Sequence, residues 1–411
     1  MKIGYACTPI MCQYKTTRTL TLKNYSEENI YPIIENNLYD LLAILKYNSK
    51  HHIYMFRISS DIIPLGSHHV NTFPWQKEFK SILDEIGNFI IENNMRVSMH
   101  PGQYTLLNSP KDDVVKKSIK DLSFHCNFLD SLNLPPSHKI ILHTGGVYGD
   151  KASATDRFIN TYKTLPENIK NRLIIENDER FFSVYDLFDI NEKIKVPIIF
   201  DNLHYECFGD LQMNIADILT KVKTTWKDTD GDMKIHYSQQ NPLKKKGAHG
   251  DTTILNDFIS FLKEYDFTNV DIMLEVKDKD ISSIKVNNYL LFIKNMLSDE
   301  IIKREVNNYS LFILERLGSS GLSKIQEIEH SLDLLGLYEL VDSLMYVEYN
   351  EDNFRYALNK AFSLLRYDLN NKEISHYEKN YKNKDYLKCK EYLKKLADKH
   401  DLAQCGYYFC Y

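Results

Sequence analysis

Short apolar runs alternate with longer amphipathic segments over most of the chain. The short runs are rich in Val, Ile and Phe and end at polar residues, a pattern that predicts strands buried on both faces of a parallel sheet. The clearest example is the run Val196–Phe200. The predicted strands are 3–7, 53–58, 96–99, 139–142, 172–175, 196–200, 233–237 and 270–274.

Each predicted strand is followed by a segment whose apolar residues recur with helical spacing. These segments are 31–47, 79–90, 114–132, 156–165, 184–194, 214–226, 254–265 and 281–297. Eight such alternations predict an α/β fold of the TIM (β/α)8 barrel type. An open doubly wound sheet is the fallback, but no Gly-rich GxGxxG turn follows the first strand.

The pattern changes beyond about Asp299, where only helical segments follow. They cover 311–317, 322–335, 337–347 and 354–365, with Gly336 as the expected break between the middle two, and a Lys-, Tyr- and Glu-rich stretch at 372–400. We therefore expect a barrel domain over residues 1–299 and a C-terminal helical appendage over 300–411, packed on the barrel.

Composition narrows the class of protein. The chain has 411 residues, of which 43% are hydrophobic and 26% charged, as in globular proteins. The net charge of −5 means that a polyanion must meet a local basic patch rather than the whole surface. The seven cysteines include no CxxC pair, and no apolar run approaches the ~20 residues of a membrane span. We expect a cytoplasmic protein with reduced thiols.

Most of the predicted strands end in a potential metal ligand. The residues are His100, His143, Glu176, Asp201, His236 and Glu275, with His204 and His249 in adjoining segments. A single histidine in such a place is more often a hydrogen-bonded structural residue than a ligand. In a barrel, however, the carboxyl ends of all strands meet at one rim, so these side chains would share one pocket.

Imidazoles and carboxylates in that number cannot remain unpaired in one pocket, because like-charged acids repel. Divalent metal ions resolve the conflict, and mixed His/carboxylate ligation suits zinc, manganese or iron. More ligands than one ion can use indicate two or three ions, an arrangement that can clamp the attacking and leaving oxygens of a phosphodiester.

The motifs around these residues resemble the UV damage endonuclease family. They are HPGQY at 100–104, ILHTGG at 141–146, IIEND at 174–178, FDNLH at 200–204, MKIHYS at 233–238 and AHGD at 248–251. Gly4-Tyr5, RISSD at 57–61 and PLGSH at 64–68 agree as well. The family is a TIM barrel related to endonuclease IV that nicks DNA 5′ to ultraviolet photoproducts with divalent metals, commonly manganese.

The resemblance implies a division of ligands. His100, His143 and Glu176 would hold one ion, Glu176 would bridge to a second held by Asp201, His236 and Glu275, and His204 and His249 would hold a third. The expected metal is Mn²⁺, with Zn²⁺ or Mg²⁺ as alternatives.

In the family, the lysine that matches Lys234 can be carboxylated and act as a ligand. Lys234 lies two residues before His236, so both side chains point to the same side of the strand. The alternative is an unmodified lysine that faces a carboxylate or solvent.

The resemblance also implies contacts with DNA. Gln103 and Tyr104 would enter the duplex where damaged bases leave it, and His68 would lie near the scissile phosphate. Tyr5 would either line the lesion pocket or pack in the core. The basic run Lys244, Lys245 and Lys246 would contact phosphates, although such runs are usually only solvated.

The preferred interpretation is therefore a metal-dependent hydrolase, a monomeric DNA repair endonuclease that acts on duplex DNA with damaged bases. An abasic-site endonuclease of the endonuclease IV type is the closest alternative, although Gln103, Tyr104 and Lys234 favour photoproducts. A sugar isomerase on the same barrel would also gather Glu, Asp and His around divalent ions, and Glu275–Asp280 superficially suits it. A non-enzymatic metal-binding scaffold whose helical tail recruits partners is the remaining alternative.

Overall fold

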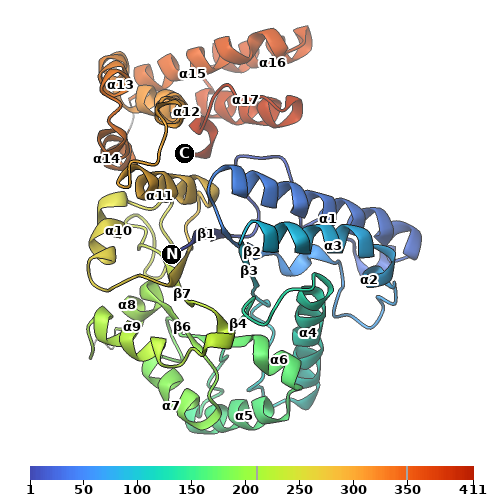
Figure 1. Cartoon of the computed structure of the whole chain (residues 1–411). Coiled ribbons are helices and arrows are strands. Elements are labelled where there is room, and N and C mark those ends of the chain that lie inside the picture. The colour runs from blue at the N-terminus through green and yellow to red at the C-terminus, as the bar shows by residue number, and fades with distance from the viewer. Residues whose placement is uncertain (210–211, 349) are drawn as a thin grey trace. The chain divides into compact units, whose positions relative to one another are not determined.

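In this computed structural model, parallel strands close into a barrel in the order in which they occur along the chain (Figure 1). They are β1 (Ile3–Ala6), β2 (Met55–Ile58), β3 (Arg96–Met99), β4 (Ile140–His143), β5 (Leu173–Glu176), β6 (Ile198–Asp201), β7 (Met233–Tyr237) and β8 (Val270–Leu274). Pairing of Tyr5 with Leu274 joins the first strand to the last. The predicted TIM barrel is confirmed.

The structure describes residues 1–209, 212–348 and 350–411. They divide into two compact units, one of Met1–Thr253 and Phe258–Ile284, the other of Ile254–Asp257 and Lys285–Tyr411. The main division thus falls between Ile284 and Lys285, whereas the sequence pattern places a boundary at 299/300. All seven cysteines are free thiols. Among the described helices, none combines the length and apolar character that crossing a membrane requires.

Helices alternate with the barrel strands and surround them (Figure 1). They are α1 (Glu27–Lys50), α2 (Trp75–Glu78), α3 (Lys80–Glu92), α4 (Asp112–Ser131), α5 (Lys151–Thr164), α6 (Glu167–Arg172), α7 (Val184–Ile194), α8 (Asn202–Phe208), α9 (Ile215–Lys223), α10 (Leu255–Leu262) and α11 (Asp280–Phe292).

Side-chain caps explain where several of these helices begin. Ser26 accepts the N–H of Asn29 at the start of α1, and Ser183 and Asp186 form a capping box at the start of α7. Asp201 caps α8 in the same way by accepting the N–H of His204. This short helix is absent from the sequence-based expectation, because its seven residues are too few for a helical period to be recognised.

The interior of the barrel is charged as well as apolar. Arg96 and Ser98 lie two residues apart on β3, so both side chains point to the same side, and their contacts with β8 and β7 show that this side is the interior. Arg96 Nη1 lies 3.0 Å from Asp271 Oδ2 on β8, and Lys234 Nζ on β7 donates to Ser98 Oγ at 2.7 Å. Because a buried charge is costly unless it is paired, these contacts constrain which strands lie opposite each other.

The second unit is built from helices. Those that begin and end within it are α12 (Asp299–Leu317), α13 (Ser320–Ser331), α14 (Leu334–Leu344), α15 (Glu351–Leu365), α16 (Asn371–Lys382) and α17 (Tyr386–His400). The helical nature of the C-terminal segment is confirmed. The predicted break at Gly336 is wrong, because Asp333 caps α14 by accepting the N–H of Gly336, and the chain turns at Leu332, whose φ is +55°.

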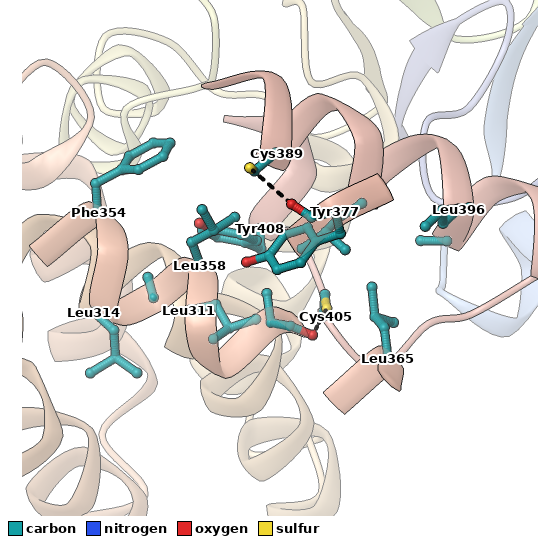
Figure 2. Close-up of a cluster of buried hydrophobic side chains, with 14 of the residues drawn as sticks. Leu311, Leu314, Phe354, Leu358, Leu365, Tyr377, Cys389, Leu396, Cys405 and Tyr408 are labelled. Carbon is teal, nitrogen blue, oxygen red and sulfur yellow. Dashed lines mark hydrogen bonds between the residues drawn. The ribbon is translucent and has the colours of Figure 1, made fainter. Parts of the chain in front are cut away.

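A hydrophobic core of its own lies within this unit (Figure 2). Leu311 and Leu314 of α12 pack with Leu358 of α15, and Tyr377 of α16 and Cys389 of α17 complete the cluster. The Cys389 thiol faces the backbone oxygen of Tyr377 at 4.0 Å. Because helices far apart in sequence contribute to one core, the unit is held together by its own contacts.

Truncation of Leu358 tests this core. Leu358 is fully buried, so Leu358→Ala leaves a cavity and should lower the free energy of unfolding by about 2–5 kcal/mol in urea. The control Leu387→Ala removes a side chain that is 60% exposed and should change it by no more than about 0.5 kcal/mol. Equal losses in the two variants would contradict this assignment of the core.

Candidate metal centre

Glu176, the last residue of β5, is the point on which the potential ligands converge. Its register partner on β4 is His143, and residues in register on neighbouring parallel strands project to the same side. The Glu176 side chain is 1% exposed, and His100 Nε2 lies 3.1 Å from its Oε2. His236 Nδ1 lies 2.6 Å from its Oε1. One buried carboxylate therefore contacts imidazoles from several strands.

Among the residues that the structure describes, three groups of side chains could each hold a metal ion, and all share Glu176. Within each group the ligand atoms lie within 4.8 Å of one another. The groups are His100, His143 and Glu176; Glu176, Asp201 and His204; and Glu176, His236 and Glu275. The structure thus brings these seven potential ligands together, as the sequence predicts, and their binding of metal stays a prediction.

The division between groups differs from the one that the resemblance implies. Asp201 groups with His204, whereas His236 and Glu275 form a separate group with Glu176. The reason is local, because Asp201 caps α8 and His204 follows one helical turn later, with its Nδ1 3.8 Å from Asp201 Oδ1. His249 lies outside all three groups, but its ring centroid is 6.2 Å from that of His204.

The electrostatics of the site fit the binding of cations. Burial would raise the pKa of Glu176, but His236 and His143 hold it well below the ordinary value. Burial, with Glu176 and Glu275 nearby, raises the pKa of Asp201 to about 7, although His204 acts in the opposite direction. The nearby histidines therefore compensate the negative charge of these acids only in part.

One buried atom supports the same conclusion. Asp201 Oδ2 has no hydrogen-bond partner among the residues that the structure describes. Buried polar atoms are normally satisfied, so such an atom needs an explanation. Asp201 belongs to one of the ligand groups, and a carboxylate oxygen is a suitable donor for a divalent cation.

Arg57 on β2 is a residue of the site that sequence reasoning assigned no role. The guanidinium is 10% exposed, forms an ion pair with Glu275 and lies 2.9 Å from His236 Nε2. Against the effect of burial, Arg57 holds the pKa of Glu275 far below its ordinary value. The sequence contains a hint of this role, because Arg57 interrupts the otherwise apolar strand Met55–Ile58, and a buried arginine needs a buried partner.

Lys234 lies deep in the barrel, two residues before His236 on the same inward side of β7. It is 1% exposed, and burial together with Arg57 and Arg96 lowers its pKa well below the ordinary value. Its amine donates to Ser98 Oγ. The structure thus places this lysine beneath the ligand groups rather than in solvent.

The loops above the site carry the residues expected to contact DNA. Gln103 and Tyr104 are exposed in the loop after β3, Tyr104 by 67%. His68 is half-buried in the loop after β2 and stacks on His69, with ring centroids 4.4 Å apart. Tyr5 is different, because it is fully buried and its hydroxyl donates to Asn48 Oδ1 at 2.8 Å. Its position is that of the core-packing alternative.

The basic run lies in the loop between β7 and α10. Lys244, Lys245 and Lys246 are all exposed. Lys244 Nζ forms an ion pair with Asp251 at 2.9 Å, so its charge is partly compensated within the protein. Because the loop follows the carboxyl end of β7, the run lies at the same rim as the ligand groups.

Comparison with known proteins agrees with this geometry. The family model described as UV-endonuclease UvdE matches residues 1–305. A UV DNA damage endonuclease of Clostridium perfringens (strain 13 / Type A) is 47% identical over 400 residues, which cover 97% of this chain and 96% of the relative. A UV DNA damage endonuclease of Bacillus cereus (strain Q1) is 31% identical over 307 residues, 72% of this chain and 96% of the relative.

A solved structure is also similar. The crystal structure of SacUVDE superimposes with a TM-score of 0.68 at 42% sequence identity. The match covers 72% of this chain and 100% of that chain. Sequence and fold therefore point to the same group of proteins.

Neutralising the shared carboxylate tests the centre. Glu176→Gln keeps the shape of the side chain but removes the charge common to all three groups, so affinity for Mn²⁺ should fall by at least about 10-fold. The number of bound ions per chain, measured by plasma mass spectrometry after dialysis, should fall with it. Glu192→Gln, at an exposed position of α7, is the control and should retain the metal. Equal metal content in both variants would exclude Glu176 as a ligand.

Proposed function

Since this chain belongs to the UV-endonuclease family, we propose that it cuts the DNA backbone immediately 5′ to ultraviolet photoproducts. Cyclobutane pyrimidine dimers and 6-4 photoproducts are the proposed lesions, in double-stranded DNA. We further propose that the enzyme is a hydrolase that uses two or three divalent ions, Mn²⁺ in preference to Zn²⁺ or Mg²⁺, and that it acts as a monomer in the cytoplasm. The observation that carries the proposal is the set of three ligand groups that share Glu176.

The protein side chains divide the work of this site. His100, His143, Glu176, Asp201, His204, His236 and Glu275 would hold the ions, and His249 would join them from beside His204. When bound, divalent ions activate water at neutral pH and stabilise the charge of a phosphodiester during displacement.

Neighbouring residues orient these ligands. Asn177 is fully buried and bonds both to the backbone N–H and to the backbone oxygen of Asp201, which fixes that strand end. Arg57 holds Glu275 beside His236 through its ion pair. Such outer contacts set the direction of a ligand and thereby its affinity for a metal.

Lys234 would be a further ligand if it carries the carbamate that the family resemblance implies. Its burial and its place on the same side of β7 as His236 support this proposal. Formation of the carbamate joins the neutral amine nitrogen to carbon dioxide and releases one proton, so a neutral side chain becomes a negative one. The lowered pKa of Lys234 favours this neutral amine.

Lesion recognition would use the loop after β3. Gln103 and Tyr104 are exposed, and an amide and an aromatic face can replace the pairing and stacking that are lost when bases leave the duplex. Flipping costs least at a damaged site, which supports selectivity for lesions. His68 at the rim would contact the phosphate to be cut.

A nicking assay tests the proposal. With Mn²⁺, the protein should cut an ultraviolet-irradiated duplex 5′ to its photoproducts and leave an unirradiated duplex intact, and chelation of the metal should abolish cutting. Glu176→Gln should lose nicking and retain DNA binding. Cutting of an abasic duplex alone would reject the photoproduct assignment in favour of an abasic-site endonuclease.

The salt dependence of DNA binding tests the basic run. If Lys245 and Lys246 each neutralise one phosphate, then Lys245→Gln and Lys246→Gln should each reduce the slope of log affinity against log salt by about 0.9. Lys244→Gln should change the slope less, because Asp251 already pairs with Lys244. Lys193→Gln, at the end of α7 that precedes β6, is the control at the opposite end of the barrel. Equal slopes for all four variants would show that the run is only solvated.

A further inference from the structure

A cavity of about 550 Å³ lies at the end of the barrel opposite the metal centre. Its walls are formed by the segments that lead into β4, β5, β6 and β7, whereas the potential metal ligands gather at the carboxyl ends of the strands. The volume is in the range of small-ligand sites, ~300–1,000 Å³. No role assigned above uses this cavity.

The lining of the cavity is strongly basic. Lysines come from the last turns of α5, α6 and α7, from the residue that ends α7, and from the segment after α9, so positions distant in sequence converge on one space. They are Lys163, Lys170, Lys193, Lys195 and Lys227. All except Lys170 are exposed.

The two acids of the wall are already engaged. Glu167 Oε1 accepts a hydrogen bond from Lys170 Nζ at 2.9 Å. Asp230 forms an ion pair with the buried amine of Lys139, and its Oδ2 accepts the backbone N–H of Lys227 at 2.8 Å. The other four lysines of the wall form no ion pair with any residue that the structure describes. The cavity therefore has more positive charge than its own acids can compensate.

A buried hydroxyl group lines the same cavity. Tyr162 is 6% exposed, and within the described part of the chain no hydrogen bond reaches its hydroxyl. Burial, together with Glu167 and Asp230, raises the pKa of Tyr162 to about 12, so the hydroxyl stays protonated at neutral pH and can donate. Because buried polar groups are normally satisfied, an acceptor from a ligand would complete this site.

Helix ends explain only part of the positive charge. Lysines in the last turn of a helix compensate the negative end of its dipole, and Lys163 and Lys193 hold such positions. Lys195 ends α7 with a φ of +55°, where helices usually have glycine, which adopts this conformation without strain. Lys227 precedes the short 3-10 turn Asp228–Asp230, so it compensates no helix end. Folding alone explains Lys195 and Lys227 poorly.

We propose that this cavity binds a small anion with two or more phosphate groups, with lysine amines around the phosphates and the Tyr162 hydroxyl as a further donor. Lysine binds phosphate as a point charge, and several lysines in one hollow raise the local concentration of anions. Pro136, Ile194 and Pro197 add apolar surface on which an organic group can pack. Inorganic polyphosphates and nucleoside polyphosphates share this chemistry. The inference does not rest on the proposed function.

Isothermal titration calorimetry with the full chain tests binding and distinguishes the sources. Tripolyphosphate and ATP, in buffer without free metal, should each bind at least about 10-fold more tightly than inorganic phosphate, because they engage more lysines at once. Tighter binding of ATP than of tripolyphosphate would identify a nucleoside polyphosphate, and equal or weaker binding an inorganic one. Absence of saturable binding for both would overturn the proposal.

Variants locate the binding site. Lys195→Asn and Lys227→Gln should each weaken the binding of tripolyphosphate by about 3- to 10-fold, and Tyr162→Phe, which removes only the hydroxyl, by about 2- to 10-fold. Lys227→Gln keeps the backbone N–H that Asp230 accepts. Lys50→Gln is the matched control, because Lys50 is exposed in the last turn of α1, at the same end of the barrel but outside the cavity. Equal affinities in all four variants would place any binding elsewhere and overturn the assignment.

Thermal stability separates binding from a structural role. Asn tolerates positive φ better than Lys, so Lys195→Asn should retain or raise the melting temperature of the free protein. The rise in melting temperature that tripolyphosphate gives the wild type should be smaller in this variant. A lower melting temperature with unchanged affinity would show that Lys195 is structural and overturn its place in the site. Displacement of tripolyphosphate by an undamaged DNA duplex would overturn the small-anion assignment.

Discussion

The crowding of acids and imidazoles around Glu176 is the constraint on which the rest of the structure depends. A carboxylate buried to this degree costs several kcal/mol unless partners compensate its charge. The partners here are imidazoles, whose own charge varies, and one arginine that is engaged by Glu275. The conflict is visible in Asp201 and His204, whose pKa values are both raised, to about 7 and about 9. Divalent cations would compensate the negative charge of the acids, because the charge of a metal ion does not depend on pH and each ligand has a defined direction toward it.

The interior of the barrel, below the acidic rim, contains basic side chains. Arg57, Arg96 and Lys234 point inward at successive depths, and each has a defined contact on another strand. Buried pairs of this kind stabilise little in net terms, but a missing partner would leave a bare charge. These contacts favour the observed arrangement of strands, which is also the arrangement that brings His143 into register with Glu176 and Asp201 into register with His236. The fold and the site depend on the same contacts.

The barrel and its ligands could be predicted from the sequence because strand ends are local signals. An apolar run followed by His100 or Glu176 identifies both a strand and a rim residue, and closure of the barrel brings such residues together. The division of ligands could not be predicted, because it depends on Asp201 acting as the cap of α8 and on side-chain directions that spacing does not encode. The role of Arg57 could not be predicted either, because its partner Glu275 follows β8, 218 residues away in the sequence. Gly336 shows the opposite error, since its helix-breaking tendency is overcome by the cap that Asp333 provides.

The candidate metal site belongs to the first of the two structural units and not to the helical second unit. Every candidate ligand and the basic cavity at the opposite end of the barrel lie in the first unit, within the residues 1–305 that match the family model. The match with SacUVDE covers the whole of that chain but only 72% of this one. The match with the Clostridium perfringens relative covers 97% of this chain, so it extends over most of the helical unit. That unit has its own core around Leu358 and buried ion pairs such as Lys390 with Glu315. Because these contacts lie within the unit, its hydrophobic core is separate from the metal ligands, all of which belong to the first unit.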